Sequence, residues 1–222
     1  MDGTPATCTQ LGLHHFFRDR APVDLVISGP NYGRNCTSLF ALSSGTLGGA
    51  LEAAAFKKRS IAISYAFFSR DLDASVLDAA TKLSVKVVEY LVKNWGDDVE
   101  LYSVNVPLVA GVEKKQVYFT NMLENYWDGG CAFDEVNAGT KAVDAKENDE
   151  GNEMKIREQA ESGVVDNKNE IKSDGTISHA RHNHRHFKWA PKFADVYRSV
   201  EQSEAGNDGW AIRQGYTRSV LL

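Results

Sequence analysis

Polar residues with the potential for ligand chemistry gather in one short segment of the chain, between residues 28 and 46. Residues 28–35 combine glycine, asparagine and arginine, and residues 44–46 read Ser-Gly-Thr. Glycines let the backbone approach a ligand closely, and the free N–H groups at the start of a helix attract anions such as phosphate. The amide oxygen of Asn31 suits a hard cation such as Mg²⁺ or Mn²⁺, and Asn35 could donate to a phosphate oxygen.

A simpler interpretation explains the same segment without a ligand. Gly, Asn and Ser are common in turns and at the N-caps of helices, so a turn followed by a capped helix accounts for their spacing. The segment matches neither the GxGxxG pattern nor a Walker loop. Spacing alone therefore favours the turn and leaves the phosphate and metal site as an alternative.

The segment joins elements that are typical of an α/β fold. Residues 23–28 form a continuous apolar run, which predicts a strand buried on both faces, and residues 44–56 predict a helix rich in small residues. Residues 60–67 and 101–106 predict two further strands, while apolar residues at steps of three and four predict a helix over 74–95. This alternation predicts a three-layer α/β fold with a mainly parallel, Rossmann-like sheet, whose ligands sit at the carboxyl ends of the strands.

Charge is distributed unevenly along the chain. The formal net charge is −5, but residues 134–178 alone hold 12 acidic and 6 basic residues and no aromatic residue. Such a segment buries too little apolar area to offset the entropy of ordering, so we predict a disordered acidic insertion there, within a single domain over residues 1–222. The remaining body is nearly neutral, which argues against a broad nucleic-acid surface.

The lengths of the apolar runs and the number of cysteines indicate the cellular environment to be expected for the protein. No run approaches the roughly 20 apolar residues of a membrane span, which argues against a membrane role. Cys8, Cys36 and Cys131 are an odd number without CxxC spacing, so we expect neither a disulfide framework nor a zinc site, and a cytoplasmic location. Cys8 lies near the candidate site without an identifiable base, and we expect it to be a packed structural thiol.

Several stretches resemble, in order, motifs of the SurE family. Residues 23–35 (VDLVISGPNYGRN) and 43–54 (SSGTLGGALEAA) resemble the strand, loop and helix in which an SGxNxGxN stretch leads into SGT. Residues 2–13 resemble the DGTPxDCxxLGL stretch, residues 103–108 (SVNVPL) the NxNxP strand, and residues 215–222 the terminal strand. The likeness covers most of the chain outside the acidic segment, and it is stronger to the fungal-type branch of the family.

The resemblance implies divalent-metal hydrolysis of phosphate monoesters, with Mg or Mn as cofactor. The activity would be of the 5'/3'-nucleotidase or acid phosphatase type, on a nucleoside monophosphate or another small phosphate ester, and the assembly a homodimer or tetramer. Asn31 matches the family's metal-ligand asparagine, and the resemblance implies catalytic roles for Asn35, Ser44 and Thr46. The residues that match its phosphate-binding positions are Asn35, Ser44, Gly45, Thr46, Asp2, Gly3 and Thr4.

The sequence departs from the family at its beginning. The family's other metal ligands, an Asp pair in a DDG motif and a serine, precede the DGTP stretch at which this sequence begins. We therefore expect a truncated domain without the N-terminal strand and metal-binding segment, with a sheet edge and apolar surface exposed. The adjacent pair Asp97 and Asp98 follows a predicted helix end and indicates a solvated turn.

Three functions remain open at this point. The first is a metal-dependent phosphomonoester hydrolase. The second is a non-catalytic module, truncated or degenerate, that binds a phosphorylated ligand or a protein partner. The third is an unrelated nucleotide-binding α/β protein.

Overall fold

The computed structural model divides the chain into two compact units, residues 1–126 with 194–222 and residues 127–193, which we describe separately. No helix in the described part of the chain has both the length and the apolar character needed to cross a membrane. Most of the predicted insertion, residues 137–178, lies outside the described residues, as does Asp2. The described residues are 3–20, 22–68, 73–136 and 186–221.

A five-stranded sheet organises the larger unit. The strand order is β1-β2-β3-β7-β4, in which β1, β2 and β3 are parallel, β7 is antiparallel to β3, and β4 is parallel to β7. The predicted mainly parallel sheet is therefore confirmed. The strands are β1 (Leu25–Tyr32), β2 (Arg59–Ala66), β3 (Leu101–Pro107), β4 (Val117–Phe119) and β7 (Thr217–Leu221).

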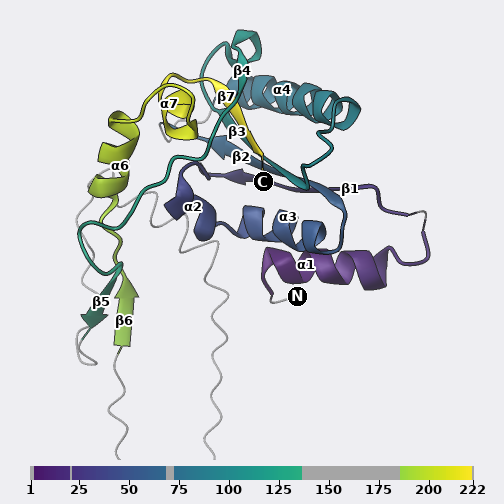
Figure 1. Cartoon of the computed structure of the whole chain (residues 1–222), viewed down its shortest axis with the longest axis horizontal. Helices are drawn as coiled ribbons and strands as arrows, with labels where there is room; N and C mark the ends of the chain where they lie inside the picture. The colour runs from purple at the N-terminus through teal and green to yellow at the C-terminus, as the bar shows by residue number, and fades with distance from the viewer. Residues whose placement is uncertain (1–2, 21, 69–72, 137–185, 222) are drawn as a thin grey trace, which may run out of the picture. The chain divides into compact units, whose positions relative to one another are not determined.

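Helices cover both faces of this sheet and complete the three predicted layers. On one face lies α4 (Ala74–Lys93), and on the other lies α3 (Gly45–Ala55) with α1 (Pro5–Leu11) packed against its outer side (Figure 1). Both long helices were predicted to within three residues at each end. The shorter helices are η1 (Gly12–Phe16), α2 (Ser38–Leu42), η2 (Val112–Lys114), α6 (Phe193–Glu201) and α7 (Asp208–Arg213).

Alternate residues of the central strands supply two apolar cores. The larger core lies between the sheet and α4, whose buried residues recur at the helical spacing that the sequence predicts. On the α3 side the core is smaller, because α3 presents glycine and alanine and so lies close to the sheet. The residues of the two cores include Ile61, Ile63, Val87, Leu91 and Val104 towards α4, and Leu47, Ala50, Ala62 and Leu101 towards α3.

Strand β1 differs from its prediction. It was expected to be buried on both faces and to end at residue 28, but it continues to Tyr32 and stands at the edge of the sheet, with β2 as its one strand neighbour among the described residues. Ile27 is consequently 46% exposed. An uninterrupted apolar run does not by itself distinguish a central strand from an edge strand, whereas the family resemblance implied an exposed sheet edge with exposed apolar surface.

The smaller unit is a short hairpin-like pair with aromatic packing. Strands β5 (Phe133–Val136) and β6 (His186–Trp189) pair antiparallel. The rings of Trp127 and Phe193 lie 6.3 Å apart, and Phe133 lies 5.0 Å from Trp189. Residues 134–136 of the predicted insertion lie in β5, and the rest of it, residues 137–178, lies outside the described residues.

Candidate functional site

A row of polar residues crosses the sheet at the carboxyl ends of the three parallel strands. Asn31 of β1 lies opposite Ser64 of β2 in the ladder. Ser64 lies opposite Asn105 of β3, which in turn lies opposite Arg218 of β7. Because residues paired in this way share a face of the sheet, all four side chains are on the face that α3 covers. The carboxyl ends of parallel strands are where α/β proteins bind ligands.

A bulge in β1 brings Asn31 into this row. Ser28 lies opposite Ala62, yet Asn31, three residues further on, lies opposite Ser64, only two residues beyond Ala62. In a regular strand Pro30 would occupy that place and Asn31 would face α4. The extra residue therefore turns Asn31 to the polar face, which is the known effect of a β-bulge beside a functional site.

The Asn35 side chain joins members of the row. Its Nδ2 donates to Asn31 Oδ1 at 3.1 Å and to Ser64 Oγ at 2.7 Å. Its backbone N–H donates to Asn105 Oδ1 at 2.7 Å, and the residue is buried. The structure thus places Asn31 and Asn35, which the sequence proposes as a metal ligand and a phosphate ligand, in one hydrogen-bonded network.

A buried ion pair fixes the loop that follows Asn35. Arg218 Nη2 donates to the Asn35 carbonyl oxygen at 2.7 Å, and its Nη1 lies 3.5 Å from Asp208 Oδ2, with both side chains fully buried. Asp208 also accepts hydrogen bonds from the N–H groups of Thr37 and Leu123, each at 2.8 Å. Thr37 has a φ of 69°, which is strained for a β-branched residue and persists only where the surroundings enforce it.

The other proposed phosphate residues lie at the start of α3. Ser44 caps this helix, since its Oγ accepts from Leu47 N at 3.0 Å, as the simpler interpretation of the sequence requires. Thr46 lies beside the β1 bulge, because a Cβ added to Gly29 would be 3.2 Å from the Thr46 methyl group. Thr46 thus connects the helix start to the residues that precede Asn31, although no hydrogen bond among the described residues joins Ser44 or Thr46 to Asn35.

The first turn of α1 packs against the same end of α3. A Cβ added to Gly45 would lie 3.0 Å from Pro5 Cγ, so α1 begins next to α3. Thr4 caps α1 by accepting from Thr7 N at 3.2 Å, and Gly3 precedes it. Gly3 and Thr4 are therefore on the side of the larger unit where α3 begins, while nothing is placed for Asp2.

The side-chain oxygen and nitrogen atoms of the polar row suit an anion better than a metal ion. Asn31 Oδ1 already accepts a hydrogen bond from Asn35, and the described part of the chain holds no group of three or more His, Cys, Asp or Glu residues that could bind a metal ion. Asn105 Nδ2 is buried without a hydrogen-bond partner among the described residues, and this atom is a donor. A hard dication prefers several charged oxygens, so the described residues do not by themselves fit one. Asp97 and Asp98 lie in an exposed turn, as predicted.

Sequence reasoning missed the residues that hold the network together. Ser64 and Asn105 occupy positions that, by strand alternation, face inwards among apolar residues, and Arg218 lies in β7, where alternation places it on the same face as Val220. A polar residue at an inward position of a buried strand was the available signal, since buried polar groups are retained where they form hydrogen bonds. Asp208 gave no such signal, because its partners lie in distant segments.

The cysteines differ in solvent exposure, and the prediction of a packed Cys8 thiol is wrong. Cys8 was expected to be packed, but it is exposed, because α1 turns Pro5 and Thr9 rather than Cys8 towards α3. Cys36 is fully buried next to the Asn35 loop. Burial, with a smaller contribution from the negative charge of Asp208, raises the pKa of the Cys36 thiol to about 11.

We therefore expect two thiols to react with an aromatic disulfide reagent at pH 8 in the native protein, and the third only after unfolding. The thiolate is the reactive form, and Cys36 is both protonated at this pH and inaccessible. Absorbance of the released thiol before and after addition of guanidinium measures the two classes. A Cys36→Ala variant serves as the control, because its native count should stay at two. Three fast thiols in the unaltered protein would contradict the burial of Cys36.

Comparisons with known proteins identify the family of the chain and relatives with two different names. The family model "Survival protein SurE" matches residues 1–129. The "Probable tubulin--tyrosine ligase PBY1" of Saccharomyces cerevisiae is 42% identical over 131 residues, which are 57% of this chain and 17% of that protein. The "5'-nucleotidase SurE" of Ruegeria pomeroyi is 41% identical over 119 residues, which are 51% of this chain and 45% of that protein. The chain thus spans less than half the length of both relatives.

A solved structure supports the fold independently. The crystal structure of the Sure protein from Aquifex aeolicus superposes with a TM-score of 0.58 at 22% sequence identity, over 100% of this chain and 67% of that chain. At this identity the likeness concerns the fold alone. It agrees with the three-layer arrangement of α4, the sheet and α3 (Figure 1).

Proposed function

Because the chain belongs to the SurE family, we propose that it provides the phosphate-binding side of a phosphomonoester hydrolase of the nucleotidase or acid phosphatase type. The observation that carries this proposal is the network of Asn31, Asn35 and Ser64 at the carboxyl ends of β1 and β2. The substrate would be a nucleoside monophosphate or a related small phosphate ester. The relative from Ruegeria pomeroyi is named as a 5'-nucleotidase, which supports this substrate class.

Each proposed residue has a role that its position allows. The first N–H groups of α3, at Gly45 and Thr46, have no partners within the helix and favour a phosphate oxygen. Asn35 would act as a positioning residue, since its Nδ2 already donates to Asn31 and Ser64. Asn31 would hold the reacting group near the bulge. Such prearranged donors stabilise the charge that develops during phosphoryl transfer.

The family resemblance also implies a divalent metal, Mg or Mn, which would supply Lewis acidity and an activated water when bound. Asn31 is the residue of this chain proposed to contribute to that site. Since the described residues offer neutral oxygens there and no cluster of acidic side chains, we derive no catalytic step through the metal. Any hydrolysis would need further acidic ligands.

The same observation favours a second candidate function. Described residues that offer the donors of a phosphate site without the charged oxygens of a metal site would bind a phosphorylated ligand without turnover. We keep this non-catalytic module as the alternative. Binding that survives removal of divalent metal by a chelator would distinguish it from the hydrolase.

The test is phosphate release from AMP and from 4-nitrophenyl phosphate, with and without Mn²⁺. For a hydrolase, Asn31→Ala should lower kcat/KM by about 100-fold, the effect of removing one prearranged polar group from an active site. Asn94→Ala is the matched control, because Asn94 is an exposed asparagine at the end of α4. Circular dichroism establishes that each variant is folded.

The outcomes separate the two candidates. Metal-dependent release that Asn31→Ala abolishes supports the hydrolase. A folded chain that binds AMP in the presence of EDTA, with no release under any condition, supports the binding module. Neither release nor binding of AMP, in a folded chain, would refute both.

A further inference from the structure

A pocket lies between α4 and the strands β4 and β7, on the face of the sheet that α4 covers (Figure 1). Its volume is about 330 Å³, at the low end of the range that small-ligand sites occupy. Ser219 of β7 lines this pocket, whereas its neighbour Arg218 belongs to the polar row on the α3 face. Successive side chains of a strand point to opposite faces, so the pocket is separate from the site described above.

The walls of this pocket are apolar and partly aromatic. Tyr90 is 55% exposed and Phe119 is 53% exposed, so part of each ring is available to a ligand. The Phe119 ring also lies 6.3 Å from the ring of Tyr102, which is buried beneath the sheet surface and supports it. The residues of the walls are Leu83, Val87, Tyr90 and Leu91 of α4 with Val117 and Phe119 of β4.

Two polar groups line the pocket at different depths. Ser219 is 1% exposed, and its Oγ has no hydrogen-bond partner among the described residues. Buried polar atoms are normally hydrogen-bonded, so this hydroxyl is available to a ligand that enters the pocket. Lys86 is exposed and forms no ion pair with any residue that the structure describes. A ligand would therefore meet a hydrogen-bonding group at its inner end and a positive charge at its outer end.

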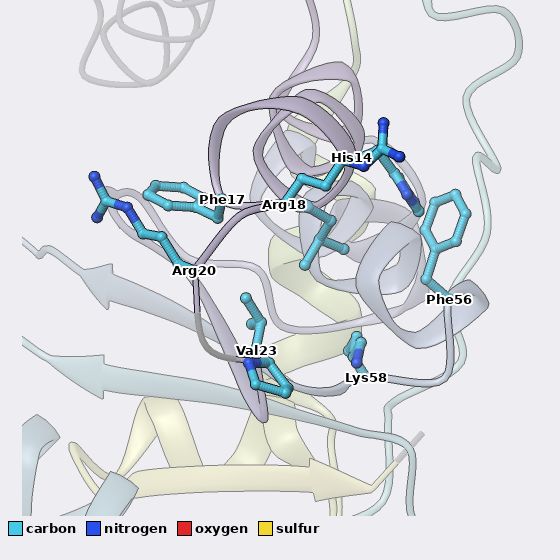
Figure 2. Close-up of a pocket in the computed structure, with 9 residues that line it drawn as sticks. His14, Phe17, Arg18, Arg20, Val23, Phe56 and Lys58 are labelled. Atoms are coloured by element: carbon cyan, nitrogen blue, oxygen red, sulfur yellow. The ribbon is translucent and has the colours of Figure 1, made fainter.

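A pocket beside η1 lacks this arrangement. It is lined by residues of η1, the segment before β1 and the segment between α3 and β2, and its volume is about 240 Å³. Figure 2 shows the Arg18 guanidinium turned away from Lys58 and the Arg20 guanidinium turned outwards. These cations do not converge, so they would not bind one ligand together.

We propose that the pocket between α4, β4 and β7 binds a small aromatic carboxylate with a hydroxyl group at its far end. The carboxylate would pair with Lys86 at the rim, and the ring would contact the aromatic walls. The hydroxyl would form a hydrogen bond with Ser219 Oγ, which can both donate and accept. A phosphate ester is disfavoured, because Lys86 is the one charged residue among those that line this pocket.

The test is titration of the isotope-labelled chain with para-hydroxyphenylpropionate, followed by the chemical shifts of the backbone amides. The Phe119 and Ser219 amides should shift in a saturable way, with a dissociation constant of about 1 mM or less. The Asn31 amide, on the other side of the sheet, should not shift.

Two analogues each remove one of the proposed contacts. Phenylpropionate lacks the hydroxyl, and para-hydroxyphenylpropionamide lacks the negative charge. Each should bind about 10-fold more weakly, because one of the two polar groups of the pocket then has no partner in the ligand.

Variants of the two polar residues should remove these differences one at a time. Ser219→Ala should equalise the affinities for para-hydroxyphenylpropionate and phenylpropionate, and Lys86→Met those for the carboxylate and the amide. Ser219→Ala should fold normally, because it removes a hydroxyl that has no partner in the described part of the chain. Lys82→Met is the matched control for Lys86→Met, because Lys82 is an exposed lysine on α4 that does not line the pocket. Its loss should change the affinity less than about 2-fold.

Three results would overturn the proposal. They are the absence of saturable shifts, shifts confined to residues that do not line this pocket, and equal affinities of the unaltered chain for all three compounds. Neither AMP binding nor hydrolysis is measured, so the outcome is independent of the test of the phosphate site.

Discussion

Replacing Arg218 by methionine should lower the free energy of unfolding by about 3–5 kcal/mol, because it leaves the Asp208 carboxylate buried without its cation. Both side chains are fully buried, and their nearest charged atoms are 3.5 Å apart. The substitution also removes the hydrogen bond to the Asn35 carbonyl oxygen. Urea unfolding followed by tryptophan fluorescence measures the change.

The exposed pair of Lys82 and Asp78 provides the control. These residues lie one turn apart on α4 with side chains 69% and 62% exposed, so Lys82→Met should leave the free energy of unfolding nearly unchanged. The double variant Arg218→Met/Asp208→Asn should recover part of the loss, since the buried charge is then removed as well. Equal losses of stability in Arg218→Met and Lys82→Met would show that the buried pair does not hold the Asn35 loop.

Replacing Gly29 by alanine should lower the free energy of unfolding by at least about 3 kcal/mol, because backbone strain and overpacking act together. Gly29 has a φ of +111°, which side-chain-bearing residues rarely adopt, and an added Cβ would overlap the carbonyl oxygen of Ile63 in the neighbouring strand. The backbone must then move away from β2. Since Gly29 lies within the bulge that orients Asn31, we expect ligand binding at the polar row to fall together with stability.

Gly48→Ala is the matched control for this substitution and should change the free energy of unfolding in the opposite direction. Gly48 lies inside α3, and an added Cβ there would meet nothing within 4 Å. Alanine in a helix should raise the free energy of unfolding by about 0.5–1 kcal/mol relative to glycine. Chemical denaturation measures the free energy of unfolding of both variants. Equal destabilisation by Gly48→Ala and by Gly29→Ala would contradict the prediction.

The sequence predicted the elements whose signals are local. The helical spacing of apolar residues over 74–95 and the apolar run over 60–67 correspond to α4 and β2, and Ser44 begins α3 as its cap. These signals arise within a few residues of the chain and do not depend on tertiary contacts. The fold class and the family resemblance were therefore confirmed.

The arrangement of the site could not be predicted in the same way. Asn35 and Arg218 are 183 positions apart in the sequence and yet share a hydrogen bond, and the bulge that turns Asn31 depends on pairing with β2. Such features follow from register across strands, for which a single sequence carries no local pattern. The roles of Asn31, Asn35, Ser44, Gly45 and Thr46 in binding or catalysis stay predictions until they are tested.

The strand order determines which strands of the sheet can pair before synthesis of the chain is complete. β7 lies between β3 and β4, although it is made after β4, so β4 finds its neighbour in the sheet only when residues 217–221 have left the ribosome. Until then, β3 lacks its β7 neighbour and Asn35 lacks the Arg218 hydrogen bond. Pairings between such distant segments close slowly. The nascent chain thus acquires a complete polar row only once β7 has been made.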